Sequence, residues 1–180
     1  MARVSYLAAQ SLDGYIAERD GSLDWLFQFG DPEKATGPEF KQFMDSVTAI
    51  VMGSATYEFL EGHEWPYEST PTWVFTSRSD RLAPDGADIR FVSGRPAEFI
   101  DDMRAAAGDD GLIWIVGGGK LADQFVDDGL LDEVLVTIVP VILGSGIPLF
   151  DKTRRLEPLE LTRTSEYRHS GLVELRYRLR

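Results

Sequence analysis

The residues best suited to chemistry in this sequence are three glycines and a lysine at 117–120. The apolar residues 112–116 before them have the composition of a strand buried on both faces. Leu121 and Phe125 after them have the spacing of one face of a helix. A strand, a glycine turn and a helix start present backbone N–H groups to an anion at the positive end of the helix dipole. The pattern predicts a site for a nucleotide-like cofactor, or else a tight turn that binds nothing.

Two known glycine motifs fit these residues to different degrees. A P-loop has Ser or Thr after its lysine, whereas this chain has Leu121 there, so a P-loop is excluded. Gly117, Gly119 and Ala122 match the loose dinucleotide-binding pattern. The acidic residue expected about twenty positions later is missing from 141–145. The glycines by themselves leave the choice between a dinucleotide and a ligand-free turn open.

A second junction of the same kind follows the apolar residues 49–52. Gly53 comes next and a helix is expected over 56–61, so backbone N–H groups could again meet an anion. Ser54 and Thr56 add hydroxyl groups to this junction. Either hydroxyl could instead cap the helix, which would by itself explain its presence.

A third strand end, after residues 72–75, carries polar side chains in place of glycines. Thr76 and Ser77 supply hydroxyls, and Arg78 supplies a forked set of N–H donors suited to phosphate. Arg81 lies near enough in the sequence to assist. Ligands of parallel sheets bind at the carboxyl ends of the strands. The three junctions together therefore predict a site for an extended ligand with more than one phosphate.

An alternation of strands and helices is needed to position these junctions, and the sequence contains one. Strands are expected at 4–10, 49–52, 72–75, 89–92, 112–116 and 133–143, and a hairpin at 159–167 and 172–180. Residues 15–17 are expected to form a short return segment after the turn at 11–14. Helices are expected at 39–46, 56–61 and 96–107 and after the three glycines, and loops at 31–38 and 144–150. The predicted fold is α/β, with a mostly parallel mixed central sheet between layers of helices and a C-terminal antiparallel hairpin.

Composition restricts the function of the protein. A chain of 180 residues, 43% of them hydrophobic, is expected to form a single domain over 1–180 with a sizeable core. It has no cysteine, and neither histidine lies in a metal or triad motif, so no metal is expected. The net charge of −12 argues against binding to nucleic acid or anionic membranes. Without a secretory or membrane-spanning stretch, a cytoplasmic location is expected.

Four motifs, in order, resemble the dihydrofolate reductase-like fold: residues 8–17 (AAQSLDGYIA), 51–57 (VMGSATY), 75–78 (FTSR) and 116–119 (VGGG). Within that fold, SLDG at 11–14 and the stretches 129–134 and 140–150 resemble the reductase domain of the bifunctional riboflavin-biosynthesis deaminase/reductase and its stand-alone relatives. The resemblance implies NADPH as cofactor and a small-molecule substrate. It also implies a homodimer, because members of the family often pair along the strand expected at 133–143.

The resemblance further implies which residues contact NADPH. They are Ala9, Ile16, Gly53, Ser54, Thr56, Thr76, Ser77, Arg78, Val116, Gly117, Gly118, Gly119, Lys120 and Leu121. Backbone groups of Ala9 and Ile16 would hold the nicotinamide carboxamide. Gly53, Ser54 and Thr56 would bind the pyrophosphate. Residues 76–78 would bind the 2′-phosphate. Residues 117–121 would pass the centre of the cofactor, and such proteins often have a cis peptide between the first two glycines.

The main hypothesis is an NADPH-dependent reductase of a small heterocyclic or carbonyl/imine substrate. Asp13, Trp25 and Tyr57 are the candidates for the substrate pocket, and Asp24 is the candidate for orienting the substrate or donating a proton. Ser54 stands where the family usually has an arginine, which leaves the choice between NADPH and NADH open. The alternative is a non-catalytic NADP-binding module with a regulatory or assembly role.

Overall fold

The structure, a computed structural model, describes residues 1–61, 63–78, 80–151 and 157–179. The chain divides into two compact units, one of Met1–Tyr6 and Val47–Leu131 and one of Leu7–Ser46 and Asp132–Arg180. Strand β1 (Arg3–Ser11) contributes its first residues to one unit and its remainder to the other. The second unit is therefore built from the two ends of the sequence, and the first largely from its middle.

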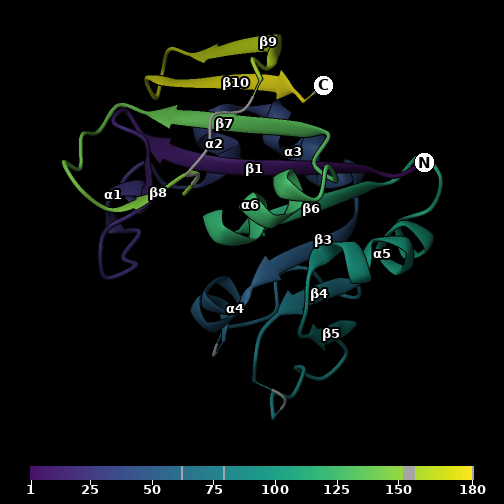
Figure 1. Cartoon of the computed structure of the whole chain (residues 1–180). Helices are drawn as coiled ribbons and strands as arrows, with labels where there is room; N and C mark the ends of the chain where they lie inside the picture. Colours follow the sequence, from purple (N-terminus) through teal and green to yellow (C-terminus); the bar gives the residue numbers. More distant parts are fainter. Residues whose placement is uncertain (62, 79, 152–156, 180) are drawn as a thin grey trace. The chain divides into compact units, whose positions relative to one another are not determined.

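The first unit is a parallel sheet with helices packed along its strands (Figure 1). The strand order is β5-β4-β3-β6 followed by the start of β1, and neighbouring strands run parallel. The strands are β3 (Val47–Gly53), β4 (Thr72–Phe75), β5 (Ile89–Val92) and β6 (Leu112–Gly117). The helices are α4 (Ser54–Leu60), the short 3-10 helix η1 (Pro96–Glu98), α5 (Ile100–Ala107) and α6 (Gly119–Asp127). Parallel neighbours need crossover connections, which these helices help to supply.

Apolar side chains cover both faces of the strands in the first unit. Val51, Ile113 and Ile115 have no exposed surface, and neither do Met103 of α5 and Phe125 of α6. Burying each large side chain of this kind contributes roughly 1.5–3 kcal/mol. This core fixes the strands whose ends carry most of the predicted cofactor contacts.

The second unit contains the antiparallel part of the fold. After the remainder of β1 come β7 (Glu133–Val139), β10 (Leu172–Arg178) and β9 (Glu160–Tyr167), with β10 antiparallel to both β7 and β9. A separate antiparallel pair joins β2 (Tyr15–Ala17) to β8 (Ile147–Pro148). The helices are α1 (Asp24–Phe27), α2 (Pro32–Thr36) and α3 (Pro38–Ser46). The predicted α/β class, mostly parallel sheet and C-terminal hairpin are confirmed.

The loop expected at 31–38 was wrong, because these residues contain α2. Asp31 accepts a hydrogen bond from the backbone N–H of Glu33 (2.8 Å), and Pro32 lies in the first turn. Both residue types favour the start of a helix as much as they favour a loop. The helix expected at 96–107 is present but divided into η1 and α5.

The strand expected at 133–143 is present but shorter than expected, because β7 ends at Val139. Pro140 has no N–H group with which to continue the ladder. The N–H of Val141 donates instead to the carbonyl of Val139 (2.8 Å), which turns the chain. The loop expected at 144–150 contains β8, a strand defined by its pairing with β2.

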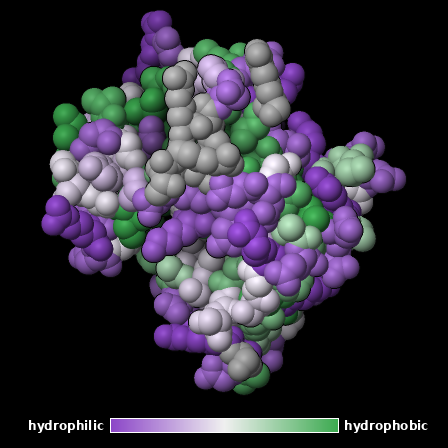
Figure 2. Space-filling model, in the orientation of Figure 1, coloured by the Kyte–Doolittle hydropathy of each residue, from purple (hydrophilic) through white to green (hydrophobic). Residues whose placement is uncertain are grey.

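Hydrophilic residues predominate on the face drawn in Figure 2, with hydrophobic residues in separate areas between them. Large apolar side chains that remain exposed include Phe27, Phe59, Ile142 and Leu161. Within the described residues, no helix combines the length and the apolar character needed to cross a membrane.

Candidate functional site

The carboxyl ends of β3, β4 and β6 lie at the same edge of the sheet of the first unit. The register pairs Gly53 with Phe75 and Met52 with Gly117, so the three strands end level with one another. Thr76 follows Phe75 directly. The three predicted junctions are therefore neighbours, as expected where parallel strands end together. We call this edge of the sheet the rim.

At Gly117 the end of β6 meets the first turn of α4. A Cβ atom at position 117 would lie 2.6 Å from Oγ1 of Thr56, closer than real Cβ contacts allow. A Cβ atom at Gly118 would lie 3.9 Å from the Cα and N atoms of Gly53. The missing side chain at Gly117 thus lets the end of β6 approach α4, whereas a Cβ at Gly118 would make only an ordinary contact. The cis peptide expected between Gly117 and Gly118 is absent, and the positive φ of Gly118 makes the turn instead.

Helix α6 begins beyond Gly118, whose φ of 100° lies in the left-handed region that favours glycine. The carbonyl of Gly118 accepts the N–H groups of Leu121 (2.9 Å) and Ala122 (3.0 Å). In the described chain the N–H groups of Gly119 and Lys120 have no such acceptor, as is usual for the first turn of a helix. These two N–H groups are available to an anion, whereas the N–H of Leu121 is used within the turn.

Helix α4 starts at Ser54, earlier than the expected 56. Its N-cap is Gly53, which has no side chain, so neither Ser54 nor Thr56 occupies the capping position. Capping therefore does not account for these two hydroxyl residues. Both are half-buried at the rim, where Thr56 packs against Gly117.

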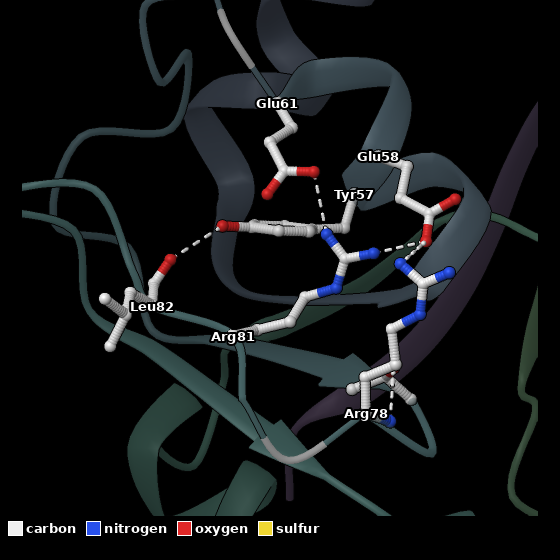
Figure 3. A network of polar contacts seen from close by, with 7 residues as sticks. Tyr57, Glu58, Glu61, Arg78, Arg81 and Leu82 are labelled. Carbon is white, nitrogen blue, oxygen red and sulfur yellow. Dashed lines mark hydrogen bonds and ion pairs between the residues drawn. The ribbon is translucent and has the colours of Figure 1, made fainter.

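The corner after β4 is stabilised by a local turn. Oγ1 of Thr76 accepts a hydrogen bond from the backbone N–H of Arg78 (3.1 Å). Ser77 and Arg78 are exposed. The guanidinium of Arg78 lies 3.3 Å from Oε1 of Glu58 on α4 (Figure 3). The residue predicted to bind phosphate is thus already paired with a carboxylate.

Arg81 also contacts Glu58 and is far more enclosed than Arg78, because its side chain is only 6% exposed. Its Nη1 donates to Glu61 (2.7 Å) and its Nη2 to the same oxygen of Glu58 that contacts Arg78. Its guanidinium lies over the ring of Tyr57, 5.4 Å from the centroid. Sequence reasoning named Arg81 as a helper and missed both glutamates. The available signal was their spacing of three residues, which places Glu58 in α4 and Glu61 directly after its last residue.

Tyr57, predicted for the substrate pocket, borders a cavity of about 150 Å³ in the first unit, together with His63, Trp65 and Leu82. Its hydroxyl donates a hydrogen bond to the carbonyl of Leu82 (3.1 Å). Burial raises the pKa of this hydroxyl, and the nearby carboxylate of Glu61 raises it further. The Tyr57 hydroxyl is therefore protonated and already engaged at neutral pH.

Asp13 lies in the second unit and fastens two distant parts of the sequence together. Its carboxylate accepts hydrogen bonds from the N–H groups of Leu143 (3.1 Å) and Gly144 (2.7 Å) and from the hydroxyl of Ser11 (2.7 Å). The Ser11 hydroxyl is the main cause that lowers the pKa of Asp13, and the two backbone N–H groups lower it further. We call these four residues the Asp13 clasp.

The other predicted residues of the second unit differ in exposure. Trp25 is 5% exposed, and its indole N–H has no hydrogen-bond partner among the described residues. Asp24, its neighbour on α1, is exposed. Ala9 and Ile16 are half-buried, and Ala9 packs against the apolar cluster that contains Trp25. Their contacts with a cofactor or substrate stay predictions.

Parallel strands that carry helices, followed by an antiparallel hairpin, define the dihydrofolate reductase-like fold. Dihydrofolate reductase from Enterococcus faecalis, complexed with NADP(H), has a TM-score of 0.58 to this chain. The two are 17% identical, over 98% of this chain and 95% of the reductase.

The chain belongs to the RibD C-terminal domain family, whose model matches residues 2–171. The Bacillus subtilis (strain 168) protein YwjB is 34% identical over 176 residues, spanning 97% of this chain and 95% of YwjB. A putative riboflavin biosynthesis protein from Shewanella sp. PV-4 has a TM-score of 0.82 at 30% identity, over 100% of both chains. The predicted resemblance to riboflavin-biosynthesis reductase domains is confirmed.

Proposed function

We propose that this protein is an NADPH-dependent reductase of a small heterocyclic or carbonyl/imine substrate. The observation that carries the proposal is the rim, where glycine backbone, hydroxyls and an arginine from three strand ends lie side by side. Membership of a family of riboflavin-biosynthesis reductase domains supports it. The reductase from E. faecalis with the same fold is complexed with NADP(H), which agrees with a cofactor of this kind.

The donors of the rim fit a dinucleotide with phosphates at two places. The free N–H groups of Gly119 and Lys120, with the exposed ammonium group of Lys120, would attract the pyrophosphate. The hydroxyls of Ser54 and Thr56 would add neutral donors. Arg78 would contact the 2′-phosphate. A side chain at position 117 would displace Thr56, so the cradle depends on glycine there.

Catalysis in such a site would rest mainly on positioning. Bound NADPH would supply the hydride from C4 of its nicotinamide ring. Backbone groups of Ala9 and Ile16 would orient the carboxamide of that ring. Asp24, exposed at the start of α1, is our candidate for orienting the substrate or delivering its proton. Trp25 would help to exclude water.

The test is a titration of the protein with NADPH and NADH, following tryptophan fluorescence. We expect NADPH to bind at least about tenfold more tightly, a difference of about 1.4 kcal/mol. Arg78→Ala should remove most of that preference and leave NADH binding unchanged. Arg95→Ala, which removes an exposed arginine paired with Asp128 elsewhere in the first unit, is the matched control. If neither nucleotide binds, the reductase proposal fails.

A non-catalytic NADP-binding module is the second candidate function, because Asp24 is exposed on a helix of only four residues. Loss of NADPH absorbance in the presence of a carbonyl, imine or pyrimidine-like acceptor would decide in favour of the reductase. Binding of NADPH without turnover of any acceptor class would favour the module.

We also propose that the protein forms a homodimer, as family resemblance implies. Strand β7 lies between β1 and β10, so its edges are already paired. A dimer would therefore use other apolar surface, such as Leu159 and Leu161 at the outermost strand β9. Light scattering should give twice the chain mass of 20.1 kDa. A mass of one chain would overturn this proposal.

A further inference from the structure

Two arginines share one carboxylate oxygen at the end of the rim. Oε1 of Glu58 is contacted by Nη1 of Arg78 at 3.3 Å and also by Nη2 of Arg81 (Figure 3). Both arginines come from the segment after β4, and Glu58 projects toward them from α4. Any ligand group that approaches Arg78 therefore also approaches Glu58.

The two arginines are held very unequally. Arg81 is 6% exposed, donates to both Glu58 and Glu61, and lies over the ring of Tyr57. Arg78 is 64% exposed and has the single 3.3 Å contact with Glu58. Exposed single ion pairs contribute little, whereas an enclosed guanidinium with two carboxylates is fixed. Arg78 can therefore leave Glu58, whereas Arg81 stays paired with it.

The charges of this cluster cancel. Two guanidinium groups face two carboxylates, so a phosphate group meets a neutral surface instead of a positive one. A phosphate dianion at Arg78 competes with Glu58 for the guanidinium and is repelled by the nearby carboxylate. A ribose 2′-hydroxyl carries no charge and encounters neither effect. The carboxylate therefore acts selectively against the phosphorylated nucleotide.

We propose that Glu58 is a specificity-determining residue that reduces the advantage of NADPH over NADH by competing with the 2′-phosphate for Arg78. This inference rests on the proposed NADPH-binding function. It explains why the turn after β4 places an arginine suited to phosphate beside a carboxylate. A carboxylate is the group that binds a ribose hydroxyl in NAD sites. The protein then still prefers NADPH, but by a smaller factor than Arg78 would give without Glu58.

The test compares wild-type protein with Glu58→Gln and Glu61→Gln, using dissociation constants for NADPH and NADH. Gln at 58 removes the competing charge and keeps the shape, so the preference for NADPH should rise about fivefold. Glu61→Gln removes the same charge from the residue that follows α4, and it leaves the contact between Glu58 and Arg78 in place. That variant should change the preference by less than about twofold.

The double variant Glu58→Gln with Arg78→Ala shows whether the effect passes through Arg78. The increase seen in Glu58→Gln should vanish in the double variant, because no guanidinium is left to release. Adenosine 2′,5′-bisphosphate and adenosine 5′-monophosphate, measured in parallel, report on the 2′-phosphate alone. Thermal unfolding of each variant verifies that it is folded, and Glu58→Ala serves in its place if Glu58→Gln is not.

Each result has a distinct meaning. If wild-type protein binds both nucleotides and Glu58→Gln leaves their ratio within about twofold, this inference is wrong and the proposed function stands. If the ratio rises equally in Glu61→Gln, a general charge effect replaces the role of Glu58. If neither nucleotide binds the wild type, the proposed function and this inference fail together.

Discussion

Asp13 and Arg78 were both predicted to contact a ligand, and their surroundings differ sharply. The carboxylate of Asp13 receives three hydrogen bonds from its own chain, two of them from backbone N–H groups. The guanidinium of Arg78 has one ion pair and is largely exposed. A charged group whose bonding capacity is filled by the backbone holds the fold together. A charged group with a single, exposed ion pair can exchange that partner for a ligand.

The comparison predicts opposite effects for the two alanine variants. Asp13→Ala leaves the N–H groups of Leu143 and Gly144 without their acceptor and should lower the Tm by roughly 2–6 °C. Arg78→Ala should change the Tm by about 1 °C or less. Thermal unfolding followed by circular dichroism measures both. An equal decrease in Tm in the two variants would show that Asp13 and Arg78 do not differ in their contribution to stability.

Acid should release the Asp13 clasp. The pKa of Asp13 is lowered from its ordinary value of 3.8, chiefly by the Ser11 hydroxyl. A group with a lowered pKa in the folded state stabilises the fold above its ordinary pKa, and that contribution is lost as the pH falls through the folded-state value. The Tm difference between wild type and Asp13→Ala should therefore be constant well above the ordinary pKa of 3.8 and shrink as the pH falls below it. A difference that persists at pH 2 would contradict a role for the ionised carboxylate.

Glu174 on β10 should show the reverse pH dependence. Burial raises its pKa above the ordinary 4.5, with Glu39 and Glu133 adding to the rise and Arg176 and Arg163 opposing it. A raised pKa in the folded state means that stability falls as the pH rises from the ordinary value through the folded-state value. Glu174→Gln should therefore raise the Tm by about 1–3 °C at pH 7 and leave it unchanged at pH 4. A gain of equal size at both pH values would point to packing instead of charge.

Added salt should weaken the binding of NADPH more than the binding of NADH. This is the smallest of the predicted effects. Raising NaCl from 50 to 500 mM screens Arg78 and the 2′-phosphate, which are both exposed. The affinity for NADPH should fall about twofold more than the affinity for NADH. In Arg78→Ala the two affinities should fall in parallel, and isothermal titration at both salt concentrations measures the difference.

Much of the fold followed from the sequence because its signals are local. The apolar runs that became β4 and β5 and the spacing that became α3 each lie within a few residues, so they were found with correct or nearly correct bounds. The loop prediction at 31–38 failed because proline and aspartate occur both in loops and at helix starts. Strand β8 was missed because only its pairing with β2 defines it.

The site was predictable to the extent that strand ends define it. Glycines and hydroxyls after apolar runs located the three junctions of the rim. The ion pairs of Arg78 and Arg81 were not predictable, because Glu58 lies 20 or more residues from either arginine and no periodicity links them. The N–H groups that donate to Asp13 in the clasp lie 130 and 131 residues away in the sequence. Local sequence patterns could not predict these contacts either.

The discontinuity of the second unit bears on how the protein is made. Residues 47–131 lie together in the first unit, so most of that unit leaves the ribosome in one piece. Leu7–Ser46 must wait for Asp132–Arg180 before its apolar side chains, Trp25 among them, gain their partners. During synthesis this N-terminal segment is therefore the part most in need of protection from aggregation.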